Sequence, residues 1–172
     1  PYIGEQGSLT GLMYSQAMID AFFPERLQTY LGSFATTWPQ KMADEGAIGA
    51  TVSTAQFDAI PEDMESTFDR ILFIRALHHM SRAEAEGEYL TRALSESYKM
   101  LKPGGRVGVV QHEARETMSD EWAAGNKGYV KKAHIIAAFE AAGFVLITDS
   151  ELHHNAKDIP GENDNVWRLP PS

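Results

Sequence analysis

Two adjacent histidines, His78 and His79, follow an apolar run in the segment FDRILFIRALHHM (68–80). An imidazole titrates near neutral pH, so a histidine in this position serves as a metal ligand or as a general base. Metal binding is the weaker interpretation, because adjacent residues do not readily reach one ion and no third ligand is evident. We therefore predict no metal site. His78 is a candidate base that lines a pocket, or else a hydrogen-bonded structural residue, and His79 is expected to be scaffold.

A third histidine, His112, lies in the segment GVVQHEARE beside Glu113. The segment resembles the zinc-protease motif only in part, because Glu116 stands where that motif needs its second histidine. We expect His112 to end a strand, where a substrate would lie. It is the second candidate base.

Composition excludes several classes of function. The chain has 172 residues, a formal net charge of −9 and 43% hydrophobic residues, which fits one globular domain spanning residues 1–172. Nucleic-acid binding is not expected, because it relies on clustered lysine and arginine. No apolar run approaches the length of a membrane helix, and there is no cysteine for disulfides or thiolate chemistry. A small-molecule substrate is the expected partner.

The pattern of apolar residues alternates between strands and helices. It predicts strands at 8–14, 48–58, 68–74, 106–112 and 144–152, and helices at 15–45, 81–100 and 130–142. Residues 153–172 are expected to form a loop-rich tail. Such alternation is typical of a Rossmann-like, doubly wound, mostly parallel sheet with helices on both faces. Ligands in such sheets bind at the carboxyl ends of the strands.

Local signals refine these boundaries. Pro24 and Pro39 are expected to break or start helices in the region 15–45, which Gly46 and Gly49 end. The continuous apolar run in 68–74 predicts a strand buried on both faces.

The later elements carry their own signals. Ser81 and Glu84 have the spacing of a capping box, which would start the helix 81–100. The sequence KPGG (102–105) predicts a stop and a turn, and Gly143 should end the helix 130–142.

Three segments together resemble the class I S-adenosylmethionine-dependent methyltransferases. FDRILFIRALHHM resembles that family's fourth strand and the loop after it, LKPGGRVGVVQHE its next turn and strand, and HIIAAFEAAGFVLI its next helix and strand. The order and spacing also match over most of residues 47–150. More narrowly, GVVQHEA and ELHHNAKD resemble a poorly characterised bacterial group of predicted methyltransferases.

The resemblance implies an enzyme that methylates a small molecule with S-adenosylmethionine as its cofactor. The positions that match the family's cofactor site are Met13, Tyr14, Ser15, Phe57, Asp58, Arg75 and Ala76. Asp58 would accept from the adenine amino group, and Phe57 would pack on the adenine face. Their structural alternatives are a turn aspartate and a core aromatic. Arg75 is unusual at its position and would bind a substrate carboxylate or phosphate, or form a surface ion pair.

Two departures from the family pattern weigh against cofactor binding. No glycine-rich loop precedes the strand 8–14, and Met13 or Tyr14 stands where the family places the acid that binds the ribose hydroxyls. We therefore expect a fragment that is incomplete at both ends. The sequence does not identify a compartment, so the cytoplasm is the default expectation. Such a fragment should be poorly stable or self-associate as a homo-oligomer. The alternative is a non-catalytic methyltransferase-like domain that serves binding or assembly. A nicotinamide-dependent enzyme is a further rival, but it requires a glycine-rich fingerprint that this sequence lacks.

Overall fold

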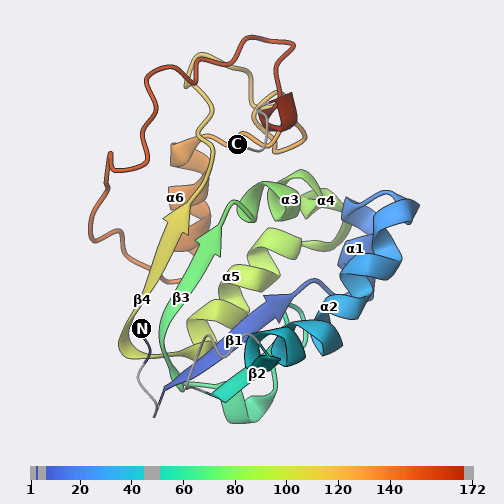
Figure 1. Cartoon of the computed structure of the whole chain (residues 1–172). Helices are drawn as coiled ribbons and strands as arrows, with labels where there is room; N and C mark the ends of the chain where they lie inside the picture. The colour runs from blue at the N-terminus through green and yellow to red at the C-terminus, as the bar shows by residue number, and fades with distance from the viewer. Residues whose placement is uncertain (1–2, 4–6, 45–50, 169–172) are drawn as a thin grey trace. The chain divides into compact units, whose positions relative to one another are not determined.

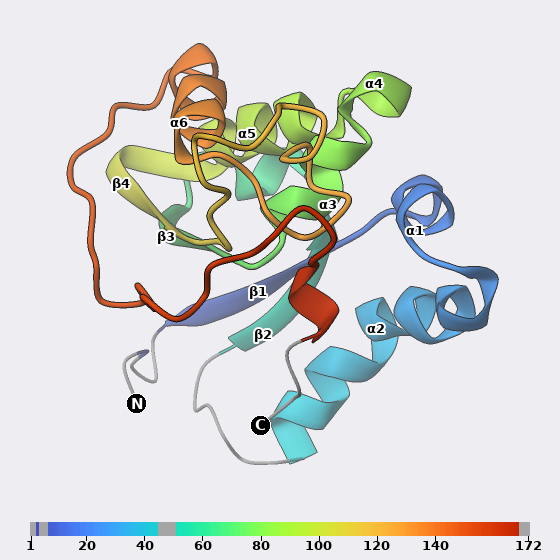
Figure 2. The same cartoon turned by 90° about the horizontal axis from the view of Figure 1, so that it is seen from above.

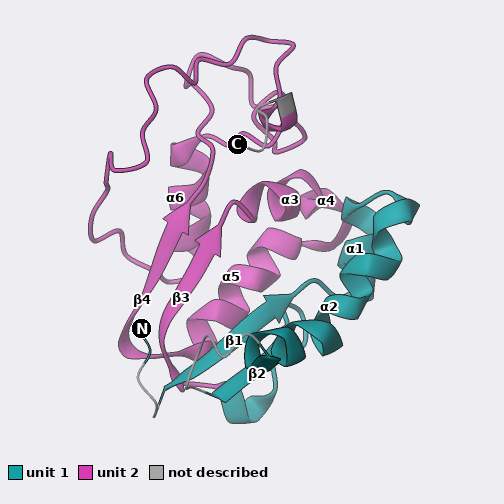
Figure 3. Cartoon of the chain, viewed as in Figure 1, with its two compact units in different colours: residues 1–64 teal, residues 65–172 magenta. Residues whose placement is uncertain are grey.

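The structure is a computed structural model that describes residues 3, 7–44 and 51–168. It divides into two compact units, residues 1–64 and residues 65–172 (Figure 3). Each unit is described below by itself.

The first unit is built on a parallel pair of strands. Its elements are β1 (Ser8–Met13), α1 (Gln16–Phe22), α2 (Glu25–Asp44), β2 (Thr51–Gln56) and the short 3-10 helix η1 (Glu62–Met64). β1 and β2 lie side by side (Figure 1), in a register that runs from Ser8 opposite Thr51 to Met13 opposite Gln56. The carboxyl ends of both strands therefore meet at one edge of this unit.

The helices of the first unit follow the sequence signals in part. Ser15 is the N-cap of α1, and its hydroxyl accepts from the backbone N–H of Met18. Pro24 precedes α2, as expected of a residue that starts a helix. Pro39, however, lies inside α2, so the helix continues through it. The predicted ends at Gly46 and Gly49 lie outside the described residues.

The second unit holds another parallel pair. Its elements are β3 (Phe68–Ile74), α3 (Leu77–Arg82), α4 (Glu84–Gly87), α5 (Tyr89–Met100), β4 (Leu101–Val110), α6 (Lys132–Ala141) and the 3-10 helix η2 (Val166–Arg168). Five consecutive pairs, from Arg70 opposite Arg106 to Ile74 opposite Val110, fix the register of β3 and β4. The carboxyl ends of β3 and β4 are thus adjacent.

The prediction that β3 is buried on both faces is wrong. Ile71 and Phe73 are buried, but Leu72 and Ile74 are 68% and 52% exposed. Successive side chains of a strand point to opposite faces, so the structure buries one face of β3 and leaves the other open. Phe73 packs edge-on against Phe139 of α6, at a distance of 6.1 Å between ring centroids.

The capping box predicted at Ser81 is also wrong. Ser81 lies inside α3, and its hydroxyl is 3.3 Å from Nε2 of His134. Glu84 instead accepts from the backbone N–H of Leu90 at 2.7 Å and from that of Thr91 at 3.3 Å, which caps α5. α5 buries one face, formed by Leu90, Ala93, Leu94, Ser97 and Met100.

The turn predicted at KPGG is a bulge inside β4 rather than a connection before it. Phe68 pairs with Leu101, but Arg70 pairs with Arg106, so residues 102–105 have no partners in register on β3. Gly104 has φ of 79°, a conformation that glycine adopts without strain.

The fifth predicted strand, 144–152, does not form. The segment leaves α6 after Gly143 and runs without helix or strand as far as η2 (Figure 2). Val145, Leu146 and Ile147 are 82%, 54% and 68% exposed. A strand needs a neighbour to pair with, and no described strand lies in register with this segment.

The described residues therefore form a mixed α/β structure with two small parallel sheets of two strands each. This arrangement is consistent with a Rossmann-like fold. The single large doubly wound sheet of the prediction is not seen as one sheet. Within the described ranges, no helix is both long enough and apolar enough to span a bilayer.

Candidate functional site

His112 lies just beyond the carboxyl end of β4, where the backbone pairs with that of Val130. The carbonyl of His112 accepts from the backbone N–H of Val130 at 3.1 Å, and Ala114 N–H donates to the carbonyl of Val130 at 2.9 Å. These two bonds extend the direction of β4 by a few residues. The backbone at His112 is therefore fixed.

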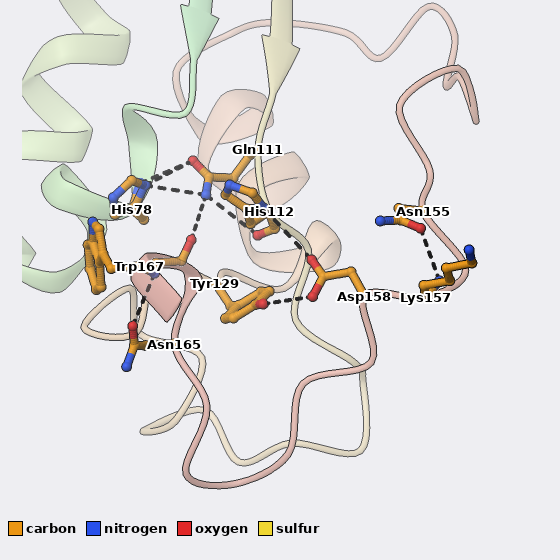
Figure 4. Close-up of polar contacts among 10 residues, drawn as sticks. His78, Gln111, His112, Tyr129, Asn155, Lys157, Asp158, Asn165 and Trp167 are labelled. Carbon is orange, nitrogen blue, oxygen red and sulfur yellow. Dashed lines mark hydrogen bonds and ion pairs between the residues drawn. The ribbon is translucent and has the colours of Figure 1, made fainter. Parts of the chain in front are cut away.

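The side chain of His112 faces a carboxylate from the C-terminal tail (Figure 4). Nδ1 of His112 is 4.0 Å from Oδ2 of Asp158, and the two side chains are 26% and 19% exposed. The other carboxylate oxygen of Asp158 accepts from the hydroxyl of Tyr129 at 2.9 Å. The ring of Tyr129 is fully buried and meets the imidazole edge-on at 5.9 Å. His112, Asp158 and Tyr129 thus form a row of three polar side chains that are partly or fully buried.

Opposing effects set the proton affinity of His112. Burial lowers its pKa, Asp158 raises it and Arg75 lowers it, with a net decrease from the ordinary value. An imidazole with a lowered pKa is neutral at pH 7 and keeps a lone pair available. His112 thus has the protonation state that a general base requires.

Gln111 connects this row to the first candidate base. Its amide Nε2 donates to the carbonyl of Gly128 at 2.9 Å and reaches the carbonyl of His112 at 3.5 Å. Both amide hydrogens are then in use. Oε1 is therefore the atom that accepts from Nδ1 of His78 at 3.4 Å, as it does from the backbone N–H of His78. This pattern favours the tautomer of His78 that is protonated on Nδ1.

His78 is far more buried than a base that meets solvent. It is 4% exposed, and burial lowers its pKa to about 4. Its Nε2 is buried and has no hydrogen-bond partner within the described part of the chain. Burial likewise lowers the pKa of His79 to about 3. The rings of His78 and His79 lie 4.0 Å apart, and the ring of Trp167 lies 5.9 Å from that of His78 and 6.4 Å from that of His79. Figure 4 shows His78 and Trp167.

A loop closes over His78 at close range. A Cβ on Gly125 would lie 2.2 Å from the carbonyl oxygen of His78, and Gly125 has φ of 110°. Only glycine fits this approach. Two open hollows flank Trp122 in the same loop, lined in part by Ser119, Lys127 and Glu162.

Arg75 and Ala76 lie where the resemblance expects them, directly after β3. The backbone N–H of Arg75 donates to the carbonyl of Val110 at 2.7 Å, which joins it to the end of β4. Arg75 has φ of 54°, a left-handed conformation that costs a side-chain-bearing residue roughly 1–2 kcal/mol. Its side chain is exposed, and its charge acts on His112.

The other expected cofactor residues lie in the first unit, where aromatic rings dominate. The ring of Tyr14 lies 5.5 Å from Phe22 and from Phe23, and 5.9 Å from Phe57. Phe57 is buried and its N–H donates to the carbonyl of Met13 at 3.1 Å. The carboxyl ends of β1 and β2 thus carry a packed aromatic cluster.

These residues differ in how they match the parts of S-adenosylmethionine. Phe57 and Asp58 are the pair that the resemblance expects at the adenine, and the ring of Phe57 is buried against Tyr14. The position expected at the ribose hydroxyls is Met13 or Tyr14, and neither carries a carboxylate. The thioether of Met13 is only a weak acceptor and its methyl group lies over Gly11, while the ring of Tyr14 packs in the aromatic cluster. The hydroxyl of Ser15 is used as the cap of α1. The ribose end of the cofactor therefore does not fit the described residues.

The described parts of the chain contain no cluster of side chains that could hold a metal ion. There, no group of three or more His, Asp or Glu side chains converges as metal ligands would.

Sequence reasoning missed three residues of this cluster: Tyr129, Asp158 and Trp167. Asp158 and Trp167 belong to the tail that was expected to be loop, and they are 46 and 55 residues beyond His112 in the sequence. No local pattern links such distant positions. Gln111 differs from these residues, because it lies beside His112 at a predicted strand end, where the carboxyl-end rule places candidate site residues.

No protein-family model and no curated protein matches this chain. Among solved structures, the chain is similar to the crystal structure of the [4+2]-cyclase SpnF, with a TM-score of 0.50 and 23% sequence identity. The similarity covers 79% of this chain and 42% of the SpnF chain, so this chain matches less than half of that protein. At this identity the likeness shows the fold alone. It supports a methyltransferase-like fold for this chain.

Proposed function

We propose that this chain belongs to an enzyme that transfers a methyl group from S-adenosylmethionine to a hydroxyl group of a small molecule. The observation that carries the proposal is His112, a neutral imidazole beside Asp158 at the carboxyl end of β4. The methyltransferase-like fold supports the same reaction class.

A base at this position favours an acceptor that must lose a proton. A hydroxyl is a weak nucleophile until its proton is removed, so Nε2 of His112 would accept that proton and later release it to water. S-adenosylmethionine, when bound, supplies a methyl group that is already activated by its sulfonium. The protein then contributes orientation and desolvation more than covalent chemistry. Arg75 would hold an anionic group of the acceptor through its guanidinium.

The first unit would contribute to binding rather than to proton transfer. Phe57 and Asp58 would hold the adenine, since an aromatic face and an adjacent carboxylate suit that ring. Met13 leaves the ribose without a carboxylate.

This mismatch favours a second candidate function, a methyltransferase-like domain that binds a small molecule without methyl transfer. SpnF, a protein of similar fold, is a [4+2]-cyclase, and one fold serves many kinds of chemistry.

Calorimetry separates the two candidates. The chain is titrated with S-adenosylmethionine and, separately, with adenine as a probe of the part that fits. Binding of both, weakened by Asp58→Asn, supports the methyltransferase. Binding of adenine without measurable binding of S-adenosylmethionine favours the second candidate. No heat from either ligand at millimolar concentration contradicts both assignments of the first unit.

A further inference from the structure

We propose that Asp158, a residue of the C-terminal tail, is the positioning residue that holds His112 with Nε2 facing its substrate. This inference rests on the proposed role of His112 as a base. Nδ1 of His112 lies 4.0 Å from Oδ2 of Asp158. Hydrogen bonds of a catalytic pair are often long before a ligand binds.

The carboxylate of Asp158 is itself oriented. Its Oδ1 accepts from the hydroxyl of Tyr129 at 2.9 Å. Tyr129 has no exposed surface and stacks on Trp122, with 5.4 Å between ring centroids. One oxygen of the carboxylate is thus held by a buried ring, and the other is turned to the imidazole.

The tail after Asp158 is attached to the rest of the second unit through its backbone carbonyls and one backbone N–H. Nη2 of Arg115 donates to the carbonyl of Pro160 at 2.7 Å, and the indole N–H of Trp122 donates to the carbonyl of Glu162 at 2.7 Å. The N–H of Val166 donates to the carbonyl of Lys127 at 3.0 Å. Pro160 is buried. A tail expected to be loop is therefore fixed on the C-terminal side of the aspartate, at residues 160, 162 and 166.

Ionisable groups from three elements lie around His112. Asp158 faces it from the tail and Arg75 acts from the end of β3, while positive charge on His112 lowers the pKa of His78 in α3. Burial and Arg75 together outweigh Asp158, so the imidazole stays neutral at pH 7. The task left to the carboxylate is orientation. It stabilises the proton on Nδ1, which leaves the lone pair on Nε2 for the acceptor hydroxyl.

Histidine nuclear magnetic resonance on the whole chain tests this assignment without any cofactor. Long-range ¹H–¹⁵N spectra report which ring nitrogen carries the proton, and His112→Gln identifies the signal of His112. In the wild type we expect Nδ1 protonated and Nε2 bare. Asp158→Ala should give a mixture of tautomers and a lower pKa of His112, because a negative charge is lost. Asp158→Glu should restore both partly.

A matched control comes from the same tail. Asp164 accepts from the N–H of Gly161 at 2.8 Å, and Asp164→Ala should leave the His112 signal unchanged. Tyr129→Phe should change the tautomer ratio in the same direction as Asp158→Ala and less strongly, which keeps the test decisive if the first variant does not fold. The inference is overturned if both variants leave His112 as in the wild type, or if Asp164→Ala has the same effect. Failure of S-adenosylmethionine to bind would instead count against the proposed function alone.

Discussion

The carboxyl ends of the two strand pairs have the same backbone arrangement and opposite chemistry. β1 and β2 end in Met13 and in the aromatic cluster of Tyr14 and Phe57. β3 and β4 are followed by Arg75 and His112, with the buried imidazole of His78 nearby. Every histidine of the chain, at positions 78, 79, 112, 134, 153 and 154, lies in the second unit. A parallel strand pair thus creates an edge for a ligand, and the residues placed there decide whether the edge can move protons.

The two units also differ in how their long helices are packed. α2 has 20 residues and none of them is buried, whereas α5 has 12 residues and buries Leu90, Ala93, Leu94, Ser97 and Met100. Apolar burial is the main stabilising contribution to folding. Four experiments test the contrast between the two units. They lower the pH, replace the candidate base, weaken the expected adenine contact and relieve backbone strain.

Acid should destabilise the second unit and spare the first. The folded-state pKa of His78 is about 4 because of burial, below the ordinary 6.5. Between these two pH values the unfolded chain binds more protons than the folded chain. The contribution of neutral His78 to the free energy of unfolding is therefore fully present above pH 6.5 and is lost as the pH falls from 6.5 through 4. This loss amounts to about 3 kcal/mol for one such histidine.

Amide hydrogen exchange resolved by residue measures this loss. From pH 7 to 4, the protection of Phe73 and Leu94, corrected for intrinsic rates, should fall, while that of Ile19 in α1 should change less. His78→Gln should remove part of the slope. An equal loss at Ile19 and Leu94 would mean that the units do not differ in this way.

Removing the candidate base should remove proton transfer and leave binding intact. His112→Gln keeps a polar side chain without a titrating nitrogen. We expect kcat for methylation of a hydroxyl acceptor to fall about a hundredfold at neutral pH, which is typical for loss of a general base. The affinity for S-adenosylmethionine, measured by calorimetry, should stay within about twofold. A variant that loses affinity and keeps kcat would reverse the roles given to the two strand ends.

The elements around the sites were largely predictable, because they depend on local patterns. The strand at Phe68–Ile74 follows from an apolar run, and the end of α6 follows from Gly143. The apolar run 144–147 gave the same signal as a strand, but a strand also needs a partner, which no local pattern contains.

The candidate site was predictable only where it lies on a strand end. His112 and Arg75 follow β4 and β3, so the carboxyl-end rule places them. Asp158 arrives through contacts of Arg115 and Trp122 with tail carbonyls, and these depend on the path of a long loop. Loop paths are set by tertiary contacts rather than by periodicity.

Weakening the adenine end should have the converse effect of removing the base. Asp58→Asn replaces a carboxylate acceptor by an amide. The affinity for adenine should fall about tenfold, the value of one charge-assisted hydrogen bond, and kcat at saturating donor should stay unchanged. Calorimetry with adenine and initial rates measure the two quantities. Glu62→Gln, on η1 of the same unit, is the control for the change of charge. Equal effects of both variants would show that Asp58 acts only through net charge.

Backbone strain gives the smallest effect and the finest contrast. Within the described residues, the non-glycine residues with positive φ are Ser66, Arg75 and Glu88, and all belong to the second unit. Glycine adopts this conformation without a steric cost. Arg75→Gly and Glu88→Gly should each raise the free energy of unfolding by about 1 kcal/mol in urea denaturation, whereas Arg75→Ala should not.

The same pair of variants separates strain from function. Arg75 lowers the pKa of His112, so Arg75→Gly should raise that pKa in histidine spectra, and Glu88→Gly should leave it as it is. A strained residue persists where the rest of the structure compensates for it, often at a functional site. If Arg75→Gly proved less stable than Arg75→Ala, the left-handed conformation would not be a cost of keeping an arginine at this strand end. If it stabilised the chain and also raised the pKa of His112, the arginine would be retained for its charge at the expense of stability.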